Sequence, residues 1–422
     1  MHAPLARARV SVVVLGDIGR SPRMQYHACA LVEALATVDL VGCAATEPHR
    51  SVRDDPRLTC HFLSPPRSAR HPETSRLGFL GSALFRVLGQ GMKLLWMLLF
   101  RIEAPRVILV QNPPAIPTLL VGWIAARARR AKLVIDWHNF GYAMLALKLG
   151  RNHPAVSVAR WYERAVGRRA DAHLCVSQAM QSELAHRWGI TAVVLYDRPA
   201  AMFAPTAPGV RQPLCERLRE TLALPAPHPV LIVSPSSWTL DEDFSVLLDA
   251  AVRCDDLIRR HDAAGGRPFP HLLFLLTGQG PLRAHYQQAI QSLTLSKVHL
   301  RTLWLSADDY PLVLGAADLG LCLHRSASGV DLPMKVADMF GAGLPVCALD
   351  YRPALAERVR HDENGLIFST AAQLATQLFE LFKNFPDDTP ILDRLRRNVV
   401  ETQALQWGAG WKNEALPLFA RL

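Results

Sequence analysis

Short apolar runs recur along the chain and alternate with segments of helical pattern. Most of these runs are continuously apolar, which is typical of strands buried on both faces of a parallel sheet. We predict twelve strands, at residues 10–15, 38–44, 107–111, 132–136, 172–176, 192–196, 229–234, 271–276, 298–303, 319–323, 345–349 and 365–368. Helical segments between them complete βαβ units, so the predicted fold class is α/β, with two doubly wound parallel-sheet domains.

The length of 422 residues also favours two domains over one. Residues 198–228 are rich in Pro and Ala, as expected of a linker. We therefore place the first domain at 1–205 and the second at 206–386. Helices over 387–422 follow and can cross back to the first domain.

Composition narrows the classes of function. Half of the residues are hydrophobic, which indicates a globular protein, and the net charge of +10 favours phosphorylated ligands, nucleic acid or an acidic membrane surface. Zinc-type spacing, RNP-like aromatic patterns and basic tails are missing from the sequence, so we expect no nucleic-acid partner. The eight cysteines include no CxxC pair and are predicted to be free thiols in a reducing compartment.

Residues 77–100 raise the question of a membrane. Only about ten residues precede the first strand, so we expect no signal peptide. The segment is long enough to span a bilayer, but Arg86, Gln90 and Lys93 interrupt it and share one helical face. This pattern predicts an amphipathic helix lying in the membrane interface. The alternative is a helix that faces the domain core.

Ligands of doubly wound sheets bind at the carboxyl ends of the strands, so these positions are the candidate site. After the first strand, residues 16–23 form a glycine-containing turn that leads into a helix. Asp17 is placed to act as a general base, and Arg20 and Arg23 to meet phosphate at the helix N-terminus. The alternative is an ordinary strand-to-helix turn.

Polar residues follow strand 107–111. Gln111 and Asn112 precede a proline-rich stretch and are candidates for holding sugar hydroxyls. A rigid turn set by the three prolines is the competing interpretation.

The sequence WHNFGY follows strand 132–136. Trp137 and Tyr142 offer flat apolar faces that suit sugar rings. His138 and Asn139 can hydrogen-bond hydroxyl groups or, for His138, move a proton. A lone histidine is more often structural, but one flanked by this group at a strand end is a better candidate.

In the second half, SPSSWTLDED and TGQGP follow two successive strands and are suited to border a diphosphate. The segment 324–346, HRSASGVDLPMKVADMFGAGLPV, is more specific. Lys335 falls in the first turn of a helix predicted to begin near 331–333, where its charge favours a leaving diphosphate. Asp338 lies one turn on and could bind ribose hydroxyls. Ordinary helix capping with a surface lysine is the alternative.

These segments carry a resemblance. GDIGRSPRMQYHA, VQNPPAIPTL, DWHNFGY, YDRP, SWTLDEDF, TGQGPL, DDYPLVLGAADLGLCLH and SGVDLPMKVADMFGAGLPV occur in this order between residues 13 and 346. The chain resembles the GT-B glycosyltransferases, specifically the chitobiosyldiphosphodolichol beta-mannosyltransferase family. The resemblance implies two Rossmann-like domains facing across a cleft, with the acceptor held by the first and the nucleotide by the second.

The implied reaction transfers mannose from GDP-mannose to GlcNAc2-diphosphodolichol with inversion, at the cytosolic face of the endoplasmic reticulum membrane. The implied partners are these two substrates and the membrane surface, and the enzyme works either alone or with other glycosyltransferases of the same pathway. No cofactor is expected, and no metal, because we see no carboxylate pair beside the diphosphate, with the DEDF carboxylates as an exception. The rival interpretations are another nucleotide-sugar transferase acting on a lipid diphosphate, and a non-catalytic subunit that binds the lipid acceptor.

The predicted site combines both halves of the chain. Asp17 and His138 are the catalytic candidates, and Asp17 is preferred as the base. The predicted acceptor-binding residues are Arg20, Arg23, Gln111, Asn112, Trp137, Asn139 and Tyr142. The predicted donor-binding residues are Ser236, Ser237, Gly278, His324, Ser328, Gly329, Asp331, Lys335 and Asp338.

The chain departs from related sequences in two ways. Members of the family commonly begin with a transmembrane anchor, which this chain lacks, so we expect residues 77–100 to supply the membrane contact. Related retaining enzymes carry two glutamates separated by seven residues. Here Val330 and Asp338 stand in those two places, which favours an inverting enzyme.

Overall fold

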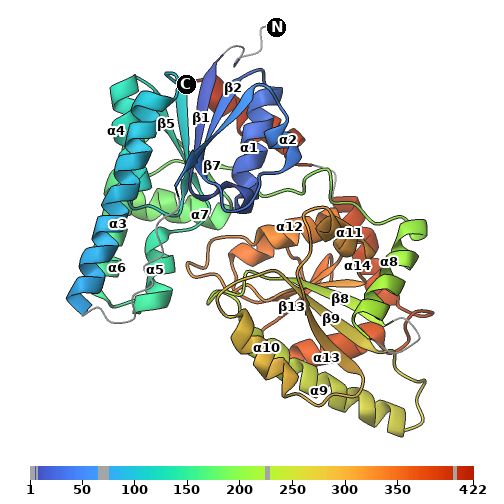
Figure 1. The fold of residues 1–422 in the computed structure, drawn as a ribbon. Helices are drawn as coiled ribbons and strands as arrows, with labels where there is room; N and C mark the ends of the chain where they lie inside the picture. The colour runs from blue at the N-terminus through green and yellow to red at the C-terminus, as the bar shows by residue number, and fades with distance from the viewer. Residues whose placement is uncertain (1–4, 6–7, 65–75, 224–228, 403–405) are drawn as a thin grey trace. The chain divides into compact units, whose positions relative to one another are not determined.

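The first sheet consists of seven parallel strands in the order β3-β2-β1-β4-β5-β6-β7 (Figure 1). The strands are β1(Arg9–Asp17), β2(Thr37–Cys43), β3(Leu58–Leu63), β4(Val107–Asn112), β5(Lys132–Trp137), β6(Ala172–Cys175) and β7(Val193–Val194). The strand order reverses at β1, which therefore lies at the topological switch point of this sheet.

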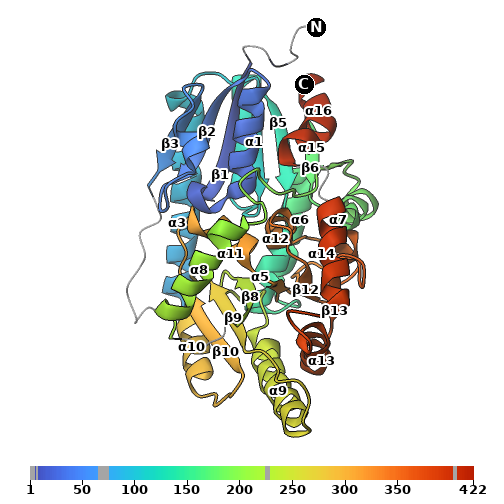
Figure 2. The ribbon, with the colours of Figure 1, turned by 90° about the vertical axis from the view of Figure 1, so that its right-hand side faces the viewer.

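Helices cover both faces of the first sheet. Figure 1 shows α3 and α4 on one face and α1 on the other. Figure 2 shows the C-terminal helices α15 and α16. The helical segments are η1(Ile18–Arg20), α1(Pro22–Glu33), α2(Arg50–Arg53), α3(Arg76–Trp96), η2(Met97–Arg101), α4(Thr118–Arg129), α5(Gly141–Leu149), α6(Pro154–Gly167), α7(Gln178–Glu183), η3(Leu184–Trp188), α15(Trp407–Glu414) and α16(Leu416–Ala420).

The second sheet has six parallel strands in the order β10-β9-β8-β11-β12-β13, with its switch point at β8. The strands are β8(Val230–Pro235), β9(Leu272–Thr277), β10(Val298–Leu303), β11(Leu319–Cys322), β12(Val346–Leu349) and β13(Gly365–Phe368). The helical segments are α8(Pro208–Thr221), α9(Phe244–Ala263), α10(Arg283–Gln291), α11(Asp309–Ala316), α12(Met334–Gly341), η4(Ala354–Glu357), α13(Ala371–Phe382) and α14(Pro390–Thr402).

Alternate residues of the second sheet enter two separate apolar cores. Ile232 and Phe274 pack in the core that contains α9 and α13. Leu231 and Leu273, their neighbours in the chain, pack in the core that contains α8, α11 and α12. Successive side chains of a strand point to opposite faces, so burial on both faces requires the continuous apolar runs seen in the sequence.

The structure is a computed structural model, and it describes residues 5, 8–64, 76–223, 229–402 and 406–422. It divides into a first unit, Met1–Tyr196 with Gly408–Leu422, and a second unit, Asp197–Trp407. The division thus falls nine residues before the predicted 205/206 boundary, and the C-terminal segment assigned to the first unit begins at Gly408.

All twelve predicted strands are present, but the sequence-based prediction missed β3. This strand lies at the edge of its sheet, and only Leu58 and Leu63, its two end residues, are buried. An edge strand that is half exposed lacks the continuous apolar run by which the other strands were recognised.

The predicted helix at 77–100 is confirmed as α3 and the π-helical turn η2. Leu94 and Leu98 are buried, and Gly91 lies close to Pro117 and Val121, so α3 packs against α4. No helix within the described ranges is both long enough and apolar enough to cross a membrane.

Candidate active site

A buried carboxylate, Asp136, is the centre of the polar cluster in the first unit. It lies in β5 and is 0% exposed. Arg23 of α1 donates from Nε to Oδ2 at 2.8 Å and from Nη2 to Oδ1 at 2.9 Å. His27, one turn further along α1, and His138, after β5, place Nε2 at 3.1 and 2.8 Å from Oδ2. A carboxylate only accepts hydrogen bonds, so each ring must present an N–H.

The C-terminal segment completes this cluster. Trp411 of α15 donates its indole N–H to Nδ1 of His27 at 3.0 Å, so His27 is neutral and carries its proton on Nε2. Burial lowers the pKa of His27 and outweighs the attraction of Asp136. Burial alone would raise the pKa of Asp136, but the positive charge of Arg23 holds it well below its usual range.

His138 is the member of the cluster that reaches solvent. Its side chain is 19% exposed, and its backbone N–H donates to the carbonyl of Asn112 at 2.8 Å. Because Nε2 donates to Asp136, the lone pair of the neutral ring lies on Nδ1, which bonds no other described residue. A histidine fixed in this way by a carboxylate is suited to accept a proton.

We expect the substitution Asp136→Asn to lower the free energy of unfolding by about 3–5 kcal/mol, because Arg23 would remain buried without its counter-charge. Asp171→Asn is a matched control, since Asp171 immediately precedes β6 and pairs with Lys132 of β5, and the two side chains are 33% and 49% exposed. That pair should contribute less than about 1 kcal/mol. Urea unfolding measures both variants, and equal losses would contradict a dominant role for the buried pair.

Glu163 of α6 shapes the turn that carries His138, and the sequence-based prediction missed it. It is 0% exposed and accepts hydrogen bonds from Nδ2 of Asn112 at 2.6 Å and from the amides of Gly141 and Tyr142 at 2.8 and 3.0 Å. Burial raises the pKa of Glu163 to about 7, although these hydrogen bonds act to lower it. The Asn112 amide also donates to the Asn139 carbonyl at 3.0 Å, so Asn112 is a structural part of the turn.

The prediction that Trp137 forms a wall for a sugar is wrong. Trp137 is 0% exposed, packs edge-on against Trp188 and donates its indole N–H to His173 at 3.2 Å. It is the last residue of β5, and its side chain points away from that of Asp136 because strand residues alternate between faces. Tyr142 is half-buried, stacks on Phe140 and has the Arg160 guanidinium 4.8 Å above its ring.

The prediction that Arg23 binds a phosphate is also wrong, because Arg23 is 1% exposed and is bound to Asp136 and to the carbonyl of Leu195.

Asp17, at the end of β1, accepts hydrogen bonds through Oδ1 from the amides of Ala45 and Thr46 at 3.2 and 3.0 Å. Arg20 lies 3.8 Å from Asp17 and is 58% exposed. Asp17 therefore holds the loop after β2 in place.

In the second unit, Glu242 joins the loop after β8 to α12. It is buried and accepts through Oε2 from the hydroxyl of Ser236 at 2.7 Å and from the amides of Ser237 and Trp238 at 2.9 and 2.8 Å. Its other oxygen, Oε1, receives the ammonium of Lys335. Glu242 was not among the predicted site residues, although the DED sequence had marked the loop.

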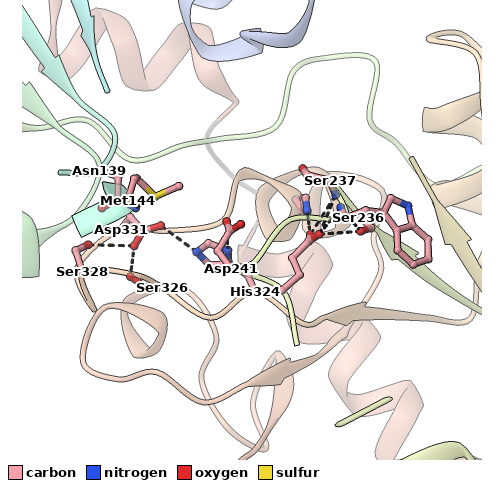
Figure 3. Close-up of polar contacts among 12 residues, drawn as sticks. Asn139, Met144, Ser236, Ser237, Asp241, His324, Ser326, Ser328 and Asp331 are labelled. Atoms are coloured by element: carbon pink, nitrogen blue, oxygen red, sulfur yellow. Dashed lines mark hydrogen bonds and ion pairs between the residues drawn. The ribbon is translucent and has the colours of Figure 1, made fainter. Parts of the chain in front are cut away.

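A second acidic residue, Asp331, organises the loop after β11 (Figure 3). It accepts hydrogen bonds from the hydroxyls of Ser326 and Ser328 and from Nε2 of His324, the last at 2.9 Å. The amide of Gly329 donates to Ser326 at 2.7 Å, which closes the loop. The backbone also bonds this strand end to the loop after β8, through the amide of Asp243 and the carbonyl of Leu323 at 3.1 Å.

Gly278 allows the loop after β9 to approach the same place. Its φ is +101°, and a Cβ there would lie 1.9 Å from the carbonyl oxygen of Ser236. Only glycine fits this position. Three loops, after β8, β9 and β11, therefore meet at the carboxyl ends of neighbouring strands around the switch point.

The site in the second unit contains eight of the nine predicted donor-binding residues. Asp338 differs, because its hydrogen bond comes from the hydroxyl of Tyr310 in α11 at 3.4 Å. Burial, together with the nearby charge of Asp197, raises the pKa of Asp338 to about 7. Among the residues that the structure describes, no group of three or more His, Cys, Asp or Glu side chains is arranged to hold a metal ion.

His324 makes this site sensitive to pH. Burial alone would lower its pKa, but hydrogen bonds to Asp241 and Asp331 raise it to about 9. Since the unfolded pKa is about 6.5, the protonated ring stabilises the fold fully below pH 6.5 and loses this effect as the pH rises through 9. We expect the free energy of unfolding to fall by about 1–3 kcal/mol over that interval.

Urea unfolding at pH 6.5 and pH 9 tests this expectation. The fall should be reduced in His324→Gln and kept in His285→Gln, which changes an exposed histidine of the same unit. A fall of the same size in the wild type and in His324→Gln would contradict the assignment.

Comparisons with known proteins agree with the geometry. Residues 5–196 match the model of the Glycosyl transferase 4-like domain. The solved structure of Alr3699/HepE from Anabaena in complex with UDP and glucose superposes with a TM-score of 0.65 over 99% of this chain and 100% of that chain, at 17% identity. The matched domain and the shared fold of two doubly wound sheets place the chain among the glycosyltransferases with the GT-B fold.

Curated relatives narrow the class to a family. The chain is 41% identical to the human chitobiosyldiphosphodolichol beta-mannosyltransferase over 98% of this chain and 93% of that protein. It is 42% identical to the UDP-glycosyltransferase TURAN of Arabidopsis thaliana over 99% of this chain and 98% of that protein. This chain belongs to the chitobiosyldiphosphodolichol beta-mannosyltransferase family.

Proposed function

We propose that the protein transfers mannose from GDP-mannose to the terminal GlcNAc of GlcNAc2-diphosphodolichol, with inversion at the anomeric carbon. The observation that carries this proposal is the 41% identity to the human chitobiosyldiphosphodolichol beta-mannosyltransferase over nearly the whole of both chains. The acceptor is a membrane lipid, so the proposed place of action is the cytosolic face of the endoplasmic reticulum membrane.

His138 is the proposed general base. Its Nδ1 takes the proton of the acceptor hydroxyl while that oxygen bonds to the anomeric carbon of mannose. Asp136 holds the ring through Nε2 at 2.8 Å and stabilises the imidazolium that forms. Asp17 is the alternative base, and the amides of Ala45 and Thr46 on its Oδ1 argue for a positioning role instead.

The second unit is proposed to bind the donor. As the bond between mannose and the diphosphate breaks, its electron pair stays with GDP, and positive charge stabilises that product. Lys335, in the first turn of α12, and the protonated His324 supply this charge. Cations of the chain are thus proposed to do the work of a metal ion in this reaction.

The test is a transfer assay with GDP-mannose and a short-chain lipid diphosphate of GlcNAc2, in the presence of EDTA. Transfer of mannose would support the donor, the acceptor and metal independence together. Transfer only after Mg²⁺ or Mn²⁺ is added would overturn the proposed role of the cations. Absence of transfer despite GDP binding would favour a non-catalytic subunit.

A second donor needs to be tested because the relative from Arabidopsis is named a UDP-glycosyltransferase. The same assay with UDP-glucose and with UDP-GlcNAc decides whether the donor is GDP-mannose or a UDP-sugar. A higher kcat/KM for a UDP-sugar than for GDP-mannose would replace the proposed donor.

A further inference from the structure

The helix α3 and the turn η2 expose one continuous apolar stripe. From Phe85 onward, the exposed positions are spaced by three or four residues and so lie on one side of the helix. They are Phe85 at 78%, Leu88 at 58%, Met92 at 67%, Trp96 at 51% and Phe100 at 72%. The opposite side, with Leu94 and Leu98, is buried in the first unit. The exposed stripe is therefore not needed for packing within the unit.

Two further helices, α4 and α6, also expose large apolar side chains. Leu120 and Ile124 of α4 are 38% and 36% exposed, and Trp161 of α6 is 69% exposed. α3 packs on α4, and the hydroxyl of Tyr162 in α6 binds the amide of Leu120 at 3.1 Å. The segment from Phe85 to Trp161 contains 12 of the 21 large apolar side chains that are exposed among the described residues. We call the exposed side chains of α3, η2, α4 and α6 the docking face.

The charges of this part of the chain are almost entirely positive. Residues 76–170 contain 15 Lys and Arg but only three acidic residues, Glu103, Asp136 and Glu163, so their surplus of 12 exceeds the +10 of the whole chain. Asp136 and Glu163 are 0% exposed, which leaves only Glu103 at the surface. The remaining residues of the chain therefore carry a slight negative surplus.

Cations also lie beside aromatic rings of the docking face and its border. The guanidinium of Arg101 lies 5.6 Å from the ring centre of Trp96, and that of Arg169 lies 5.6 Å from that of Trp123. Tryptophan and arginine side chains each have an apolar part and a polar or charged part. Both therefore favour the headgroup level of a membrane.

We propose that the docking face lies flat on an anionic lipid bilayer. The large apolar side chains would enter the boundary between headgroups and acyl chains, while Lys and Arg bind lipid phosphates. Uniform positive charge favours this occupant over a second copy of the chain, because two such faces would repel each other. The proposal deepens the proposed function by naming the surface through which the enzyme reaches its lipid-linked acceptor.

Binding of the full chain to vesicles that contain no acceptor lipid tests the proposal. Vesicles of phosphatidylcholine mixed with phosphatidylserine are compared with vesicles of phosphatidylcholine alone. We expect the anionic vesicles to bind at least about tenfold more tightly, and added salt to weaken this preference. The double variant Trp96→Ser/Trp161→Ser should bind the anionic vesicles at least about tenfold more weakly than the wild type.

Trp304→Ser is the matched control, because Trp304 lies in the second unit and is 51% exposed, as Trp96 is. It should bind vesicles as the wild type does, and circular dichroism should show that all variants are folded. The proposal would be overturned if the wild-type protein did not bind the anionic vesicles, or if the double variant bound them as well as the control does. Concentration-dependent self-association that the double variant loses would assign the docking face to a second copy instead.

Vesicle binding and mannose transfer can fail separately. Transfer to a soluble short-chain acceptor should survive in the double variant, since neither tryptophan belongs to the proposed site. If the wild-type protein bound vesicles but transferred no mannose, only the proposed function would be contradicted. If the wild-type protein transferred mannose but did not bind vesicles, only the proposed role of the docking face would be contradicted.

Discussion

The substitution His138→Ala is expected to lower kcat for mannose transfer by roughly 10²- to 10⁴-fold. The KM for GDP-mannose should change little, because the variant removes a proton acceptor and leaves the loops of the second unit intact. Asp136 fixes the ring through Nε2, so the free nitrogen is held in one orientation before the acceptor arrives. Steady-state kinetics with a short-chain acceptor measures both constants.

His61→Ala is a closely matched control. His61 binds Asp39 at 2.8 Å, and the side chains are 21% and 3% exposed, compared with 19% and 0% for His138 and Asp136. Turnover should be kept in His61→Ala. Full turnover in His138→Ala together with a large loss in Asp17→Asn would transfer the role of base to Asp17.

The substitution Lys335→Gln is expected to lower kcat by roughly 10²- to 10³-fold and to weaken GDP binding, because its ammonium group is proposed to stabilise the charge of the leaving diphosphate. Lys335 reaches the site from the first turn of α12 and is held there by Glu242 of the loop after β8. Single-turnover measurements separate the chemical step from product release, and the proposed role predicts a loss in the chemical step.

The matched control is Lys297→Gln. Lys297 and Lys335 are similarly exposed, at 25% and 24%, and each is paired with a carboxylate of the second unit. Lys297 immediately precedes β10 and so lies at the amino end of that strand, away from the three loops. Equal losses in both variants would indicate a general effect on the unit and would contradict a specific role for Lys335.

The sequence predicted the class of fold because burial on both faces gives each central strand a continuous apolar run. It also pointed to the loops after β8, β9 and β11, which the structure brings together at the carboxyl ends of neighbouring strands. The sequence-based prediction missed β3 because an edge strand needs no continuous apolar run. Only the two end residues of β3 are buried.

The cluster around Asp136 and its near neighbour His138 could not be predicted as a whole, because Asp136 also binds Arg23 and His27 of α1, and His27 binds Trp411 of α15. Residues so far apart in the sequence leave no spacing that marks their contact. Arg23 looked like a phosphate ligand beside a helix N-terminus, but it neutralises the buried Asp136 instead. The role of Arg23 follows from its burial, which the residue type alone does not reveal.

The turn WHNFGY shows why residue type alone misleads. Three aromatic residues at a strand end suggested a wall for sugar rings. Alternation along β5 instead places Trp137 in the core, while His138 after the strand reaches the surface. Glu163, which binds the amides of Gly141 and Tyr142, lies on another helix and had no marker in the motif itself.

The anomeric configuration of the product tests the central claim most directly. The product of GDP-mannose and a short-chain lipid diphosphate of GlcNAc2 can be purified and its anomeric one-bond carbon–hydrogen coupling measured by NMR. A single displacement with His138 as base predicts a β-linked mannose, which agrees with Val330 standing where related retaining enzymes carry a glutamate. An α-linked mannose would contradict the proposed mechanism and the proposed function together.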